Sequence, residues 1–107
     1  MNSQFKKGII EMCVMGLISQ KDMYGFEVIE AMAKEFDVNE NTVYPILRRL
    51  TAQNYFDTYL ETTGIAAPRK YYTITKEGSQ RMNEYREEWT TFLQGVFNII
   101  GGNHNER

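Results

Sequence analysis

The chain has 107 residues, of which 42% are hydrophobic and 24% charged, and its formal net charge is −2 at pH 7. This length suits one domain with an extra element attached, and the acidic balance argues mildly against nucleic-acid binding, because nucleic-acid domains are often strongly basic. The single cysteine excludes an intramolecular disulfide framework, no run approaches the ~20 apolar residues of a membrane span, and no signal-peptide pattern is present, so a cytoplasmic protein is expected.

Two helices are predicted in the first third of the chain. Phe5–Ile18 contains no proline and is apolar on nearly every side, which predicts a helix buried on more than one face. After a polar break, Tyr24–Phe36 carries apolar residues at helical spacing on one face and charged residues on the other.

A third helix is predicted to follow a tight connection and to run to about Gln53. Asn39 or Asn41 is a good N-cap for it, and an apolar stripe faces inward while arginines face outward. Pro45 removes a backbone donor, so it either belongs near the helix start or marks a local kink. Two helices joined by a short turn, the second with exposed arginines, indicate a helix-turn-helix unit.

Two aromatic-rich segments with strand-like composition come next, at Tyr55–Glu61 and Lys70–Thr75. Gly64 and Pro68 lie between them and mark a turn. The pair predicts a β-hairpin, and a hairpin directly after a helix-turn-helix is the arrangement of a winged helix.

The expected fold class is therefore mainly α with a small β-hairpin, a winged helix-turn-helix plus one more helix. We assign residues 1–75 to the winged helix, residues 76–100 to a C-terminal dimerisation helix and residues 101–107 to a disordered tail. Thr75 can cap the last helix, and Gly101 is expected to end it.

The last helix carries an apolar seam. Its members fall at alternating steps of three and four, which is the a/d spacing of a coiled coil. They are Met82, Tyr85, Trp89, Phe92, Val96 and Ile99. The helix either packs back on its own domain or pairs with a second copy. Because three helices and a hairpin already close a winged-helix core, the wide aromatic face favours a homodimer interface.

Basic residues concentrate in the third helix and the hairpin although the whole chain is acidic. Arginine binds guanine edges or phosphates, and short polar groups at the start of a recognition helix reach the duplex first. DNA contacts are therefore predicted for Asn39, Asn41, Thr42, Arg48, Arg49, Arg69 and Lys70, with Lys6 and Lys7 as further phosphate contacts. Each also has a simpler interpretation, such as capping for the asparagines and a solvated helix face for the adjacent arginines.

Four segments in combination resemble the PadR family of transcriptional regulators. They are Gly8–Ile18, Tyr24–Ile29, Asn41–Leu50 (NTVYPILRRL) and Pro68–Gly78 (PRKYYTITKEG). The resemblance implies a winged helix of the short subfamily, with a single C-terminal dimerisation helix. It implies a homodimeric, sequence-specific repressor of double-stranded operator DNA that a small-molecule effector releases, and it adds Tyr24, Tyr44 and Pro45 to the DNA-contacting residues.

The resemblance also implies a place for an effector, because some short family members bind flat aromatic compounds between the helices of the dimer. In this chain such a pocket would be lined by Phe5, Met12, Met15, Trp89 and Phe92. Ordinary interface packing explains Trp89 equally well.

An enzyme is not expected. The lone histidine, His104, and the lone cysteine, Cys13, accompany no phosphate loop or metal-ligand cluster, so no catalytic residue, metal or cofactor is predicted. The rival to a DNA-binding regulator is a winged helix used only for protein–protein contacts, which the net negative charge favours.

Overall fold

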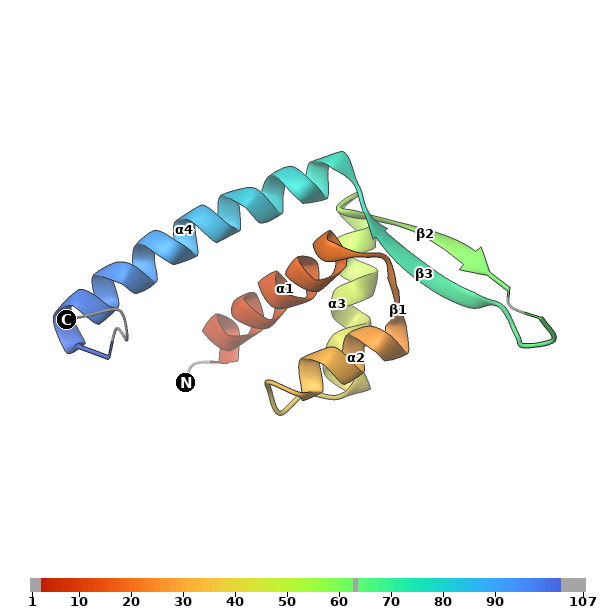
Figure 1. Cartoon of the computed structure of the whole chain (residues 1–107), viewed down its shortest axis with the longest axis horizontal. Helices are drawn as coiled ribbons and strands as arrows, with labels where there is room; N and C mark the ends of the chain where they lie inside the picture. The colour runs from red at the N-terminus through yellow and green to blue at the C-terminus, as the bar shows by residue number, and fades with distance from the viewer. Residues whose placement is uncertain (1–2, 63, 103–107) are drawn as a thin grey trace.

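The computed structural model describes residues 3–62 and 64–102, with side chains described from Lys6 onward. In chain order the elements are α1 (Ser3–Gln20), β1 (Met23–Tyr24), α2 (Gly25–Ala33), α3 (Glu40–Ala52), β2 (Phe56–Glu61), β3 (Arg69–Ile74) and α4 (Lys76–Ile100). The expected fold class is confirmed: α2 and α3 form the helix-turn-helix, and the β2–β3 hairpin forms the wing (Figure 1). Most of the tail predicted at 101–107 lies outside the described residues.

The sheet contains one strand that was not predicted from the sequence. β1 pairs antiparallel with β3, placing Met23 opposite Tyr72 and Tyr24 opposite Tyr71, so the strand order is β1-β3-β2. Two residues are too few to show an alternating pattern, which explains why β1 was missed. β3 is the central strand, and it joins the start of α2 to the wing.

The hydrophobic core lies around α1, which contacts each of the other three helices as well as β3. Ile10, Val14, Met15 and Ile18 project from α1 into this core and are at most 3% exposed. These contacts agree with the prediction of a helix buried on more than one face, and they explain a sequence that is apolar nearly all round.

Side-chain caps fix the starts of α3 and α4. Asn39 Oδ1 accepts a hydrogen bond from the Asn41 N–H at 2.9 Å, and Thr75 Oγ1 accepts one from the Gly78 N–H at 2.9 Å. Asn39, of the two predicted asparagines, is therefore the N-cap of α3, and Thr75 caps α4 as predicted. Pro45 lies inside α3, where it leaves the carbonyl group of Asn41 without its helical donor.

α4 is attached to the core only at its beginning. It has 25 residues, of which Gly78 and Met82 alone are buried, and its length is about 37 Å at the usual helical rise. Met82 is 8% exposed and lies against Gly16 of α1. The prediction of Met82 as the first residue of a dimer seam is therefore corrected, because this side chain belongs to the core of its own chain.

The far end of α4 and the tip of the wing project from opposite sides of the helical core (Figure 1). In the part of the chain that the structure describes, no helix is both long enough and apolar enough to cross a membrane.

Candidate nucleic-acid interface

The outward face of α3 is fixed by the burial of its inward face. The inward side chains are at most 2% exposed and comprise Val43, Ile46, Leu47 and Leu50. Asn41, Thr42, Tyr44 and Arg48 consequently lie on the exposed side, with Pro45 half-buried between them. The helix thus presents a polar, hydrogen-bonding surface that begins at its N-terminus, as the sequence predicted.

The two adjacent arginines of α3 have different environments. Arg49 forms an ion pair with Glu11 of α1, with Nη2 2.7 Å and Nε 2.9 Å from the same carboxylate oxygen. Arg48 is exposed and has no carboxylate partner among the described residues. Arg49 therefore braces α3 against α1, while the guanidinium group of Arg48 remains available to a partner.

A cluster of aromatic and basic side chains joins the start of α2 to the wing. The guanidinium carbon of Arg69 lies 4.6 Å from the centre of the Tyr24 ring, and Lys70 Nζ lies 5.7 Å from the centre of the Tyr72 ring. Tyr71 packs edge-on against Tyr24 at 5.4 Å. The contact with Tyr24 holds Arg69 beside the start of α2, while Lys70 packs on a ring of its own strand. The sequence alone placed both residues only in a separate hairpin.

Gly25 permits close packing between α2 and α3. A Cβ atom at this position would lie 2.6 Å from Cε1 of Tyr44, so a larger residue would displace the tyrosine ring. Tyr44, Arg69 and Lys70 line a cavity of about 210 Å³ beside the start of α2. Helix N-termini attract anions through their unpaired N–H groups, and this cavity places two cations next to one.

The wing is also tied to the loop before β1. Tyr59 of β2 donates a hydrogen bond to Asp22 Oδ2 at 2.7 Å. This bond lowers the pKa of the Asp22 carboxyl and raises the pKa of Tyr59 to about 12. Asp22 and Tyr59 were not singled out in the sequence, because nothing in their local patterns shows that they meet.

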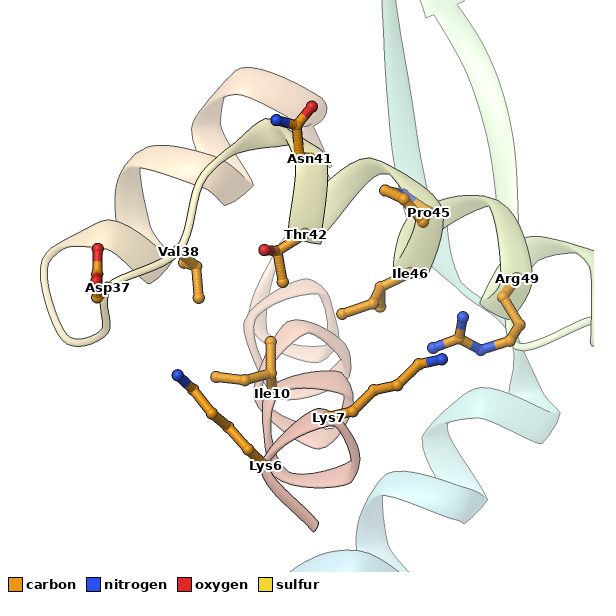
Figure 2. A pocket seen from close by; sticks show the side chains of 10 residues that line it. All are labelled: Lys6, Lys7, Ile10, Asp37, Val38, Asn41, Thr42, Pro45, Ile46 and Arg49. Atoms are coloured by element: carbon orange, nitrogen blue, oxygen red, sulfur yellow. The ribbon is translucent and has the colours of Figure 1, made fainter. Parts of the chain in front are cut away.

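A larger cavity, of about 380 Å³, lies between the beginning of α1 and α3. Figure 2 shows the side chain of Lys7 directed toward Arg49 of α3, and that of Lys6 directed toward the connection before α3, where Asp37 and Val38 lie. Asn41 and Thr42 line the same cavity. The structure thus brings both lysines to the flank of the predicted DNA-contacting helix.

The residues predicted to line an effector pocket differ in their accessibility. Met15 is fully buried in the core, so the prediction that it lines an accessible pocket is wrong for this chain. Met12 is half-buried, and on α4 the rings of Trp89 and Phe92 meet edge to face with centres 5.8 Å apart. The side chain of Phe5 lies outside the described residues.

Beyond Met82, the residues of the predicted α4 seam are half-buried or exposed. Tyr85 is half-buried and lies under the guanidinium group of Arg81, whose carbon is 3.9 Å from the ring centre. Further along, Phe92 is 57% exposed and Ile99 is 87% exposed. Trp89 and Val96 are half-buried.

The described residues give no sign of a metal centre, since they contain no group of three or more His, Cys, Asp or Glu side chains suited to one. Cys13 is half-buried, and burial raises the pKa of its thiol. His104 lies outside the described residues.

Comparison with known proteins gives consistent matches. A sequence profile of the PadR-like family of transcriptional regulators matches residues 14–84. A PadR-like transcriptional regulator from Bacillus cereus is 30% identical, with a TM-score of 0.83 over 94% of this chain and 99% of that one. A Streptococcus transcriptional regulator is also 30% identical, with a TM-score of 0.82 over 92% of this chain and 98% of that one.

A more distant match is the Bacillus subtilis negative transcriptional regulator PadR, which is 20% identical over 72% of this chain and 44% of its own length. Its structure in complex with operator DNA has a TM-score of 0.64 to this chain over 46% of that chain, at 18% identity, which shows a shared fold.

Proposed function

The chain belongs to the PadR-like family of transcriptional regulators, and from this we propose that it binds operator DNA as a homodimer, through α3 and the wing of each copy. Membership in a family of regulators agrees with the prediction that the protein is not an enzyme. The observation that carries the proposal is the outward face of α3, where Arg48 is exposed without a carboxylate partner beside Asn41 and Thr42.

Each part of this surface has a distinct role in the proposal. Asn41 and Thr42, at the start of α3, approach base edges in the major groove, and Arg48 binds a guanine or a phosphate. Arg69 and Lys70, beside the start of α2, bind the phosphate backbone. Apolar contacts to the duplex come from the same face, through Tyr24, Tyr44 and Pro45. Asn39 and Arg49 contribute indirectly: Asn39 caps the start of α3, and Arg49 holds α3 to α1 through its ion pair with Glu11.

The assembly belongs to the proposal as well. The exposed apolar residues of α4 pair with the same helix of a second copy, so that residues 1–75 form the DNA-binding unit and residues 76–100 the dimerisation unit. Repression that ends when an effector binds is proposed from the family resemblance.

The test is a titration of random-sequence and genomic duplex DNA at several salt concentrations, followed by fluorescence anisotropy. A protein that replaces counterions on phosphates loses affinity linearly in log Kd against log salt concentration. Absence of binding even at low salt would overturn the proposal and favour a winged helix that contacts only proteins.

A further inference from the structure

We propose that Asp22 and Tyr59 are positioning residues for DNA binding, which hold Arg69 of the wing at the start of α2, where it meets a phosphate. They act through a row of three packed rings, the tyrosine row, formed by Tyr24, Tyr71 and Tyr59. The inference rests on the proposed DNA binding and identifies the residues that fix the place of one of its contacts.

The tyrosine row crosses all three strands of the sheet. Tyr71 of β3 pairs with Tyr24 of β1 on one side and with Tyr59 of β2 on the other, and residues paired across antiparallel strands project from the same face. The rings of Tyr59 and Tyr71 are stacked, with centres 5.6 Å apart and planes at 12°, and Tyr71 meets Tyr24 edge-on at 5.4 Å. The three rings therefore pack as one continuous row.

This row lies where the wing leaves the body of the protein. β1 ends at Tyr24, and from Leu60 and Lys70 onward β2 and β3 pair only with each other. Beyond the row the hairpin projects away from the helical core (Figure 1). Because a two-stranded hairpin is only marginally stable by itself, the packing of the last three-stranded row fixes the direction in which the wing projects.

Asp22 anchors one end of the row to the loop before β1. Its Oδ2 accepts a hydrogen bond from the Tyr59 hydroxyl at 2.7 Å, and this bond, together with one from the side chain of Thr73, lowers the pKa of the carboxyl. Hydrogen bonds to an ionised carboxylate are roughly twice as strong as those between neutral groups. The bond joins β2 directly to the segment that leads into β1, although β3 lies between these strands.

At the other end of the row, the ring of Tyr24 holds Arg69. Arg69 lies opposite Glu61 in the pairing of the wing strands, yet among the described residues the two form no ion pair. The guanidinium carbon lies instead 4.6 Å from the centre of the Tyr24 ring. Tyr24 is the N-cap of α2, so the row places this cation where helix N–H groups also attract phosphate. A guanidinium group released from Tyr24 has Glu61 as its alternative partner, which withdraws it from the duplex.

Tyr59→Phe tests this role, because it removes the hydroxyl and keeps the ring. Random-sequence duplex DNA serves as the probe, since a phosphate contact carries no sequence information. In anisotropy titrations the variant should bind about three- to fivefold more weakly. The slope of log Kd against log salt concentration should fall by up to about 1, as the loss of one phosphate contact predicts. Unchanged affinity and slope would overturn the proposal.

Asp22→Ala separates positioning from a general effect of charge. Removal of a carboxylate alone should strengthen binding to a polyanion, whereas loss of the anchor should weaken it about three- to fivefold, as in Tyr59→Phe. Asp57→Ala is the matched control, because it removes the same charge from an exposed residue of β2 and should leave the affinity unchanged or slightly higher. An Asp22→Ala protein that binds DNA as tightly as this control would contradict the assignment.

A double-mutant cycle tests whether Tyr59 acts through Arg69. Arg69→Gln should weaken binding about tenfold, and Tyr59→Phe should have no further effect in that background, because the group that it positions is already gone. A general loosening of the sheet would add its own loss to that of Arg69→Gln. Losses that multiply in the double variant would therefore refute the positioning role.

The place of Arg69 is also measured without DNA. The ring current of Tyr24 should shift the side-chain ¹H resonances of Arg69 upfield, and Tyr59→Phe and Asp22→Ala should return them toward their ordinary positions. Arg69 resonances that are the same in the wild type and both variants would overturn the proposal. Failure of the wild-type protein to bind DNA at low salt refutes the proposed function instead, and the NMR comparison still decides whether the tyrosine row holds Arg69.

Discussion

Arg48 and Arg49 are neighbours in the sequence with opposite roles in the structure. We expect Arg48→Ala to weaken operator binding by about ten- to a hundredfold, the usual effect of losing a base or phosphate contact, with the thermal midpoint unchanged. Arg49→Ala should instead lower the thermal midpoint, because it leaves the partly buried carboxylate of Glu11 without its partner. Anisotropy and thermal denaturation of both variants check this, and equal losses of DNA affinity would contradict the distinction.

The hydrogen bond between Tyr59 and Asp22 makes the stability of the folded protein depend on pH. The folded protein raises the pKa of Tyr59 to about 12, so the stabilisation from its protonated form is present below the ordinary value near 10 and is lost as pH rises through about 12. The pKa of Asp22 is lowered, so its contribution is present above its ordinary value and is lost as pH falls through the folded value.

Ring NMR resonances resolve Tyr59 from the other six of the seven tyrosines. Tyr59 should still be protonated near pH 11, where an ordinary tyrosine is mostly ionised. Asp22→Asn should return its midpoint toward the ordinary value, and a wild-type midpoint near 10 would show that the bond does not form in solution.

The sequence predicts whether a side chain is buried or exposed where the spacing of residues along a helix decides it. The inward stripe of α3 and the exposure of Arg48 follow from a period of 3.6 residues. The pairing of Arg49 with Glu11 joins residues 38 positions apart, and no local pattern reports such a contact. The family resemblance suggested Met15 as a pocket residue, although this side chain lies in the core.

At the scale of elements, the junction between the wing and α4 depends on a residue without a side chain. A Cβ atom on Gly78 would overlap the carbonyl oxygen of Tyr55 and lie 2.8 Å from Cγ1 of Ile74. That carbonyl accepts the backbone N–H of Thr75, the N-cap residue of α4, at 3.0 Å, so it cannot move away without breaking this hydrogen bond. We expect Gly78→Ala to lower the free energy of unfolding by about 1–3 kcal/mol, as overpacking does.

Gly8→Ala is the matched control for this prediction. Gly8 lies in α1, and a Cβ atom there would meet nothing within 4 Å. The same substitution should therefore raise the free energy of unfolding by about 0.5–1 kcal/mol, the helix preference of alanine over glycine. Urea denaturation of both variants measures the two effects, and a stabilised Gly78→Ala protein would show that the junction is looser than described.

The order of the elements was predictable because each long segment carries its own signals. Asn39 and Thr75 mark helix starts, and Gly101 follows the last helical residue. β1 was not predictable, since its two residues become a strand only through their pairing with Tyr71 and Tyr72. Pro45 also shows the limit of local rules, because α3 continues through it while its inward residues remain packed in the core.

At the scale of the whole molecule, the wing and the far end of α4 lie on opposite sides of the core (Figure 1). A partner bound along the exposed part of α4 would therefore leave α3 and the wing of each copy uncovered. Two such copies would present two recognition helices at once, and DNA-binding dimers use this arrangement to contact two half-sites. We therefore propose that the outer part of the predicted seam, from Trp89 to Ile99, forms the dimer interface.

The dimer is tested by placing one charge in that surface. The wild-type chain should sediment at twice its mass of 12.5 kDa at micromolar concentration, and Phe92→Lys should sediment as a single chain, because an apolar interface does not accommodate a buried unpaired ammonium group. Leu60→Lys is the control, since Leu60 is 69% exposed on the wing and Phe92 is 57% exposed on α4, so neither substitution disturbs the core.

The monomeric variant loses the second half-site, so its operator affinity should fall far more than its affinity for random DNA. A wild-type chain that sediments at 12.5 kDa, or a Phe92→Lys variant that remains dimeric, would remove α4 from the interface.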